Sequence, residues 1–170
     1  QDPDAEDWDG LDEATKKTMD HKMAIYAAQV DRMDQGVGRV IDALKRHGAA
    51  DDTLVMFLSD NGACHEGGTL GGNYRADMTG ELGTVDSYHT YGLSWSNASN
   101  TPFRKHKSWV HEGGIATPMI VNFPGRIAEP GRITHQVGHI IDVMTTCCDV
   151  AGVAYPTTHK GHDIIPEEGS

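Results

Sequence analysis

A short apolar segment that ends in Asp60-Asn61-Gly62 most constrains how this chain can fold. Residues 53–59, Thr-Leu-Val-Met-Phe-Leu-Ser, have the length and composition of a buried β-strand. A carboxylate and an amide oxygen directly after such a strand suit a hard cation such as Ca²⁺ or Mg²⁺. Because open α/β sheets bind ligands outside the carboxyl ends of their strands, we expect Asp60 and Asn61 to lie at a binding site.

The alternative is an Asn-Gly turn that joins two strands of a hairpin. No alternating strand follows Gly62, however, and a helical pattern precedes the strand. Apolar residues recur at spacings of three and four over residues 22–47, and Gly48 follows as a helix stop. This order favours an α/β fold with a mixed, mostly parallel sheet flanked by helices.

The rest of the chain fits one domain over residues 1–170. A second strand is predicted at 118–123, before Pro124-Gly125, and a second helix at 138–151, before Gly152. Residues 62–100 are rich in Gly, Asn, Ser and Thr, and we interpret them as a long surface excursion at the rim of the site.

Composition excludes several classes of partner. The formal charge of −11 argues against nucleic acid and anionic membrane surfaces, and no apolar run is long enough to span a membrane. Cys64, Cys147 and Cys148 do not form a zinc-binding pattern. The chain begins at Gln1 rather than Met, and we expect it to be a fragment of a longer protein.

A basic run stands out in this acidic chain. Arg104, Lys105, His106 and Lys107 are consecutive, and His111 follows before Glu112-Gly113-Gly114. Such a cluster can neutralise a sulfate or phosphate oxyanion. A solvated basic loop is the commoner meaning of a short Lys/Arg run, so composition alone does not decide between the two.

Several segments, in the same order, resemble the sulfatase family, and more narrowly the arylsulfatase group of the alkaline-phosphatase-like superfamily. The resemblance covers nearly the whole chain, and the spacing from Lys107 to Glu112-Gly113-Gly114 is its most specific part. The matching segments are residues 26–38, Ser59-Asp60-Asn61-Gly62, residues 101–114, residues 117–127, residues 139–142 and residues 151–156.

The resemblance implies roles for particular residues. Asp60 and Asn61 correspond to two oxygen ligands of a single Ca²⁺, or Mg²⁺ in some members, and Lys107 corresponds to a lysine that contacts the sulfate group. His106 and His111 flank Lys107 and are candidates for lining the pocket. The implied partner is a small sulfate ester or a sulfated glycan. Periplasmic, secreted or lysosome-like export is plausible from the family alone.

The chain also departs from the family pattern. Sulfatases use a Cys in a Cys-x-Pro/Ala-x-Arg motif, converted to formylglycine, as nucleophile, and none of the three cysteines fits it. The family's paired Asp ligands, a lysine and two histidines are missing too. We therefore expect the C-terminal part of a catalytic domain, inactive and weak in Ca²⁺ binding when alone. The alternatives are a phosphate or phosphonate monoester hydrolase of the same superfamily and a non-catalytic relic.

Overall fold

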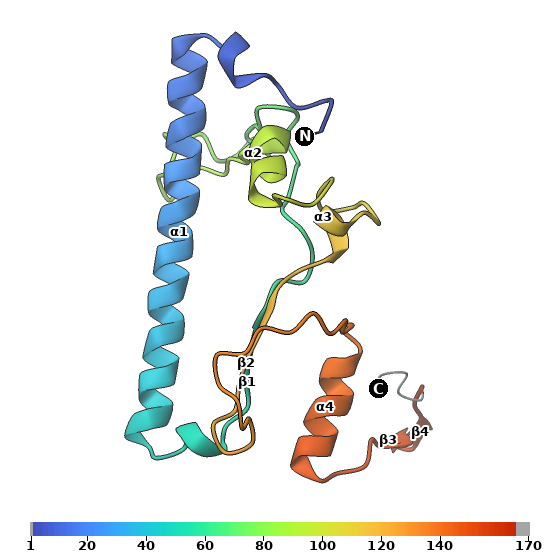
Figure 1. Ribbon diagram of the computed structural model, residues 1–170. Helices are drawn as coiled ribbons and strands as arrows, with labels where there is room; N and C mark the ends of the chain where they lie inside the picture. The colour runs from blue at the N-terminus through green and yellow to red at the C-terminus, as the bar shows by residue number, and fades with distance from the viewer. Residues whose placement is uncertain (1, 166–170) are drawn as a thin grey trace. The chain divides into compact units, whose positions relative to one another are not determined.

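The computed structural model describes residues 2–165 (Figure 1). The chain divides into two compact units, Gln1–Ala128 and Glu129–Ser170, and each is described by itself. The first unit contains, in order, η1 (Trp8–Gly10), α1 (Glu13–Arg46), η2 (Ala50–Asp52), β1 (Val55–Leu58), α2 (Gly92–Ser99), α3 (Glu112–Ile115) and β2 (Met119–Asn122). The second contains α4 (Asp142–Ala151), β3 (Thr158–His159) and β4 (His162–Asp163).

The long helix α1 is confirmed, but it begins at Glu13 rather than near residue 22. Asp12 caps it by accepting a hydrogen bond from the Thr15 backbone N–H at 2.7 Å. At the other end Gly48 has φ +67°, as a helix stop requires. Met19 is the one buried residue of α1, and most of the other residues of this helix are half-buried or exposed.

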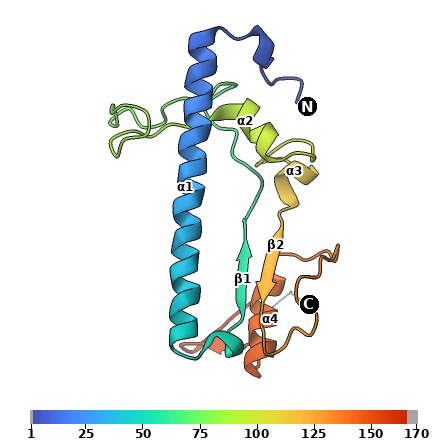
Figure 2. The same cartoon turned by 60° about the vertical axis from the view of Figure 1, so that its left-hand side comes forward.

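Strands β1 and β2 form a two-stranded antiparallel sheet with Val55 opposite Asn122 and Leu58 opposite Met119 (Figure 2). The prediction of a mostly parallel sheet is therefore not met within residues 2–165, where both small sheets are antiparallel. The reason is that the chain between β1 and β2 returns in the opposite direction. Ile120 is 64% exposed although it has the character of a buried strand residue, so this sheet has apolar faces open to solvent.

Helix α2 lies within the segment expected to be a surface excursion, and it is packed rather than exposed. Ser96 is 0% exposed and Leu93 is buried. The Trp95 indole N–H donates to the Met19 carbonyl at 2.9 Å and so joins α2 to α1. Residues 73–89 do behave as expected, because they form only isolated bridges, Asn73–His89 and Thr79–Ser87.

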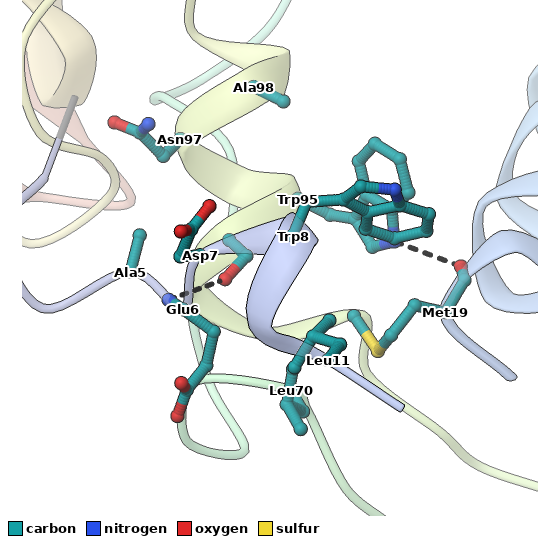
Figure 3. A pocket seen from close by; sticks show the side chains of 11 residues that line it. Ala5, Glu6, Asp7, Trp8, Leu11, Met19, Leu70, Trp95, Asn97 and Ala98 are labelled. Carbon is teal, nitrogen blue, oxygen red and sulfur yellow. Dashed lines mark hydrogen bonds between the residues drawn. The ribbon is translucent and has the colours of Figure 1, made fainter. Parts of the chain in front are cut away.

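A cavity of about 320 Å³ lies between η1, the start of α1 and α2 (Figure 3). Trp8 and Trp95 form one side, with ring centroids 6.0 Å apart, and Leu11, Met19 and Leu70 complete the apolar lining. Its lining includes none of the predicted site residues. We attribute it to packing of the N-terminal segment on α2.

In the second unit, α4 begins at Asp142 rather than at residue 138. The Asp142 carboxylate accepts a hydrogen bond from the His139 N–H at 2.7 Å, and Gly152 ends the helix in the left-handed conformation, as predicted. Strands β3 and β4 form a short antiparallel hairpin. None of the helices in the described part of the chain is long and apolar enough to cross a membrane.

Candidate active site

The Asp60-Asn61-Gly62 turn follows β1 directly and is joined to the segment before β2 by backbone hydrogen bonds. The Gly62 N–H donates to the Gly114 carbonyl at 3.0 Å. One residue before the turn, the Ser59 carbonyl accepts a hydrogen bond from the Thr117 hydroxyl at 2.9 Å. The turn is thus held against a segment about fifty residues away in the sequence.

Glycines allow these two segments to approach so closely. A Cβ atom on Gly62 would overlap the carbonyl oxygen of Gly113. On Gly113 it would overlap the Lys105 carbonyl, and on Gly114 that of Trp109. The glycines of both motifs are therefore explained by backbone contact, which their sequence positions do not reveal.

Lys107 is placed beside the turn by the same network. Its N–H donates to the Ala63 carbonyl at 3.1 Å, and the buried Ser96 hydroxyl donates to that carbonyl at 2.9 Å. Asn100 closes the arrangement, since its side-chain oxygen accepts from the Ala63 N–H at 3.0 Å. The structure therefore places the backbone of Lys107 beside the turn that is predicted to bind a metal ion.

The Lys107 side chain is 39% exposed, and its ammonium lies 3.5 Å from a carboxylate oxygen of Glu66. The Cys64 thiol donates to the other oxygen of Glu66 at 3.1 Å. This hydrogen bond and the Lys107 charge lower the pKa of Glu66, while burial raises the pKa of the Cys64 thiol. Glu66 is not among the residues predicted from the sequence, although it lies only four residues after Gly62 in the predicted metal turn.

The basic run is divided between solvent and the interior. Lys105 is only 8% exposed, and its ammonium pairs with the buried Asp2 carboxylate at 2.9 Å. The same ammonium lies 4.7 Å from the centre of the Trp109 ring. Arg104 and Lys107 remain accessible, so the run is neither a wholly solvated loop nor a single cluster of free cations.

The two candidate pocket histidines differ in setting. His106 is 3% exposed and stacks on His65 with ring centroids 4.0 Å apart, so it is an interior residue. His111 precedes α3 and lies with its ring 6.1 Å from that of Trp109. Neither lines the 320 Å³ cavity or a second one of about 270 Å³ beside His65, Glu66 and Tyr74.

Asp60 and Asn61 present the oxygen donors that Ca²⁺ or Mg²⁺ prefers. Within residues 2–165 neither side chain makes a hydrogen bond or an ion pair, so both remain available to a cation. No group of three His, Cys, Asp or Glu side chains in the described residues could hold a metal ion. The pair thus fits part of a site that needs about six oxygens.

Comparison with known proteins gives a consistent result. A family model described as Sulfatase matches residues 2–153. The chain is 35% identical, over 95% of its length, to an uncharacterized sulfatase of Schizosaccharomyces pombe. It is 31% identical over 86% of its length to an arylsulfatase of Klebsiella aerogenes, and 31% identical over 83% to an N-acetylgalactosamine-6-sulfatase of Mus musculus.

The matches cover 31%, 33% and 22% of these three relatives, so the chain spans a third of their length or less. The resemblance found in the sequence is confirmed over nearly all the residues that carry it. The chain belongs to the sulfatase family, whose catalytic domain has an alkaline-phosphatase-like fold.

Proposed function

We propose that this chain is part of an enzyme that hydrolyses sulfate esters, with Lys107 contacting the sulfate and Asp60 and Asn61 holding a Ca²⁺ or Mg²⁺ ion. The observation that carries the proposal is the hydrogen bond from the Lys107 N–H to the Ala63 carbonyl, which fixes Lys107 beside the metal turn. The names of the relatives, arylsulfatase and N-acetylgalactosamine-6-sulfatase, support this reaction class.

Each residue has a definite task in this proposal. The Lys107 ammonium donates hydrogen bonds to sulfate oxygens, and in doing so it leaves or shares its ion pair with Glu66. Asp60 and Asn61 supply two oxygen ligands to the cation. When bound, that cation offsets negative charge on the sulfuryl oxygens. Lys107 then offers a second positive charge to the same group, which favours a transition state richer in charge there.

The nucleophile comes from outside these 170 residues. Cys64 follows the predicted metal turn, but burial raises its pKa and its thiol donates a hydrogen bond to Glu66. A thiol kept protonated in this way is a poor nucleophile and a poor metal ligand. A formylglycine residue elsewhere in the longer protein, as the family pattern implies, fills this role.

The substrate is a sulfate ester of a small molecule or a glycan. A cavity of about 270 Å³ beside Glu66 is lined in part by Tyr74 and Thr69. Such a mixed lining accepts either an aryl or a sugar leaving group. The acidic charge of the chain disfavours nucleic acid as a partner.

The test compares the isolated chain with the full-length protein on 4-nitrophenyl sulfate. We expect no turnover by the isolated chain and weak Ca²⁺ binding to it by calorimetry, because it supplies only two of about six ligands. The full-length protein should release 4-nitrophenol and lose this activity with a chelator. Turnover by the isolated chain would contradict an external nucleophile. A full-length protein that is active on phosphate but not sulfate esters would contradict the reaction class.

A further inference from the structure

We propose that Asp2, Lys105 and His106 form a buried clamp that positions Lys107, which makes His106 a positioning residue for the sulfate-binding lysine. The clamp is defined by these three side chains. The contacts of the clamp bear on the position of Lys107 alone, whereas its role in sulfate binding rests on the function proposed above.

The clamp is an interior cluster of charged and titratable groups. The side chains of Asp2, Lys105 and His106 are 1%, 10% and 4% exposed. One oxygen of Asp2 lies 2.9 Å from the Lys105 ammonium and 3.8 Å from the His106 Nε2 atom. Removing Asp2 or Lys105 leaves the other buried without its counter-charge, and the His106 ring packs beside the same Asp2 oxygen.

The backbone around Lys107 needs such an anchor. Lys105 and Ser108, on either side of it, have φ +67° and +80°, values that residues with a Cβ atom adopt at a cost. The Lys105 carbonyl accepts a hydrogen bond from the Asn100 side chain at 3.2 Å, and the Lys105 ammonium is held by Asp2. The conformation that directs Lys107 away from the interior therefore depends on Asp2.

His106 joins the clamp directly to Lys107. Its Nδ1 atom lies 3.1 Å from the Lys107 carbonyl oxygen, so the N–H of the neutral ring belongs on Nδ1. Nε2 then faces Asp2 as an acceptor, at a distance too long for a hydrogen bond. The hydrogen bond at Nδ1 therefore ties the buried ring to the backbone of Lys107 itself.

His65 packs against the clamp. Its ring stacks on that of His106 at 4.0 Å, and its Nδ1 atom is buried with no hydrogen-bond partner among the described residues. Burial, the nearby His106 and Lys107 lower the pKa of His65, against the attraction of Glu66 and Asp2. The neutral form of His65 is therefore favoured, and its ring holds that of His106 in place by stacking.

The test is nuclear magnetic resonance of the 170-residue chain, labelled with ¹³C and ¹⁵N. We expect His106→Phe to shift the Lys107 carbonyl signal while keeping the fold, because the hydrogen bond from Nδ1 to that carbonyl is lost. An unchanged Lys107 carbonyl signal in His106→Phe would overturn the proposal.

Amide hydrogen exchange supplies a second measurement. Asp2→Asn should raise the exchange rate of the Lys107 amide at least about tenfold, because its hydrogen bond to Ala63 loses support. Asp4→Asn is the matched control, since Asp4 is exposed and outside the clamp, and it should change nothing. Equal exchange in Asp2→Asn and the unaltered chain would refute the clamp.

Inorganic sulfate separates this proposal from the one on which it rests. If the Lys107 signals change in His106→Phe but do not respond to sulfate in the full-length protein, the clamp stands and the sulfate role of Lys107 fails. If they respond to sulfate but do not change in His106→Phe, the sulfate role stands and the clamp fails.

Discussion

The site segments and the polar segment of this chain contain similar shares of glycine but differ in how they pack. In the site segments, residues 59–66 and 100–117, backbone groups contact partners far away in the sequence, as Gly62 does with Gly114. In the polar segment, residues 73–89, hydrogen bonds stay local, as between Gly80 and Asp86. Tyr74 and Val85 there are 56% and 89% exposed.

The difference shows that the groups packed against a glycine, and not the composition of its segment, decide whether a Cβ atom can be added there. A Cβ on Gly62 would meet the backbone of a segment that β2 holds in place. A Cβ on Gly80 would meet Thr84 and Asp86, which belong to the same exposed loop and can move with it. The glycines of the predicted site, like Gly71 and Gly92, therefore leave no room for a Cβ atom.

Gly62→Ala should have the largest effect on stability. The added methyl group overlaps the Gly113 carbonyl, and forcing the segments apart should cost about 3 kcal/mol of unfolding free energy. Gly38→Ala is the matched control, because nothing lies within 4 Å of its Cβ position in α1. It should stabilise the chain by about 0.5–1 kcal/mol, as Ala favours helix. Urea denaturation measures both, and a neutral Gly62→Ala would contradict the tight contact.

A smaller effect should separate two serines. Ser96→Ala removes a hydrogen bond from a fully buried hydroxyl to Ala63, and should cost about 1 kcal/mol. Ser87→Ala removes a comparable bond to Thr84 in the polar segment, and should cost less than about 0.5 kcal/mol because water replaces it. Equal losses of unfolding free energy in Ser96→Ala and Ser87→Ala would contradict the difference in packing between the site segments and the polar segment.

The smallest predicted effect is on pH dependence. The pKa of His65 is lowered by burial and by His106, so the unfolded chain takes up this proton more readily than the folded one. The stabilisation by neutral His65 is complete above about pH 6.5 and is lost as the pH falls toward the lower folded value. Denaturation at pH 7.5 and 5.5 should show this loss, and His65→Gln should reduce it. If the stability of His65→Gln falls between pH 7.5 and pH 5.5 as much as that of the unaltered chain, the loss arises from another group.

Asp2 acts in a lower pH window. Burial alone would raise its pKa, but hydrogen bonds from Lys105 and the Asp4 N–H, with the charges of Lys105 and His106, lower it below the ordinary 3.8. Its stabilisation is therefore present above that value and is lost only as the pH falls through the folded one. The two windows allow His65 and Asp2 to be measured independently.

Local patterns predicted the elements whose own residues determine them. The apolar spacing and Gly48 located most of α1, and Gly152 located the end of α4. The start of α1 was missed because Met19 is the one buried apolar residue before residue 22. Helix α2 was missed because its Gly, Ser and Asn residues are weak helix formers, and packing against Met19 stabilises it instead.

Long-range pairing could not be predicted in the same way. The antiparallel register of β1 and β2 joins residues more than sixty positions apart, and no turn specifies it. The family resemblance implies that Lys107 and the Asp60 turn serve one site, and this role stays a prediction. The resemblance could not show that Lys105, two residues before Lys107, faces inward, because its partner Asp2 is 103 residues away.

The most direct measurement of the central claim is the kcat/KM of the full-length protein on 4-nitrophenyl sulfate after replacing one cation at a time. Lys107→Ala should lower it at least about tenfold, or about 1.4 kcal/mol, because a contact to the charged sulfuryl oxygens is lost. Arg104→Ala removes an equal, exposed charge three residues away and should change it by less than about twofold. Unchanged kinetics in Lys107→Ala, or an equal loss in Arg104→Ala, would contradict the assignment of Lys107 as the sulfate-binding residue.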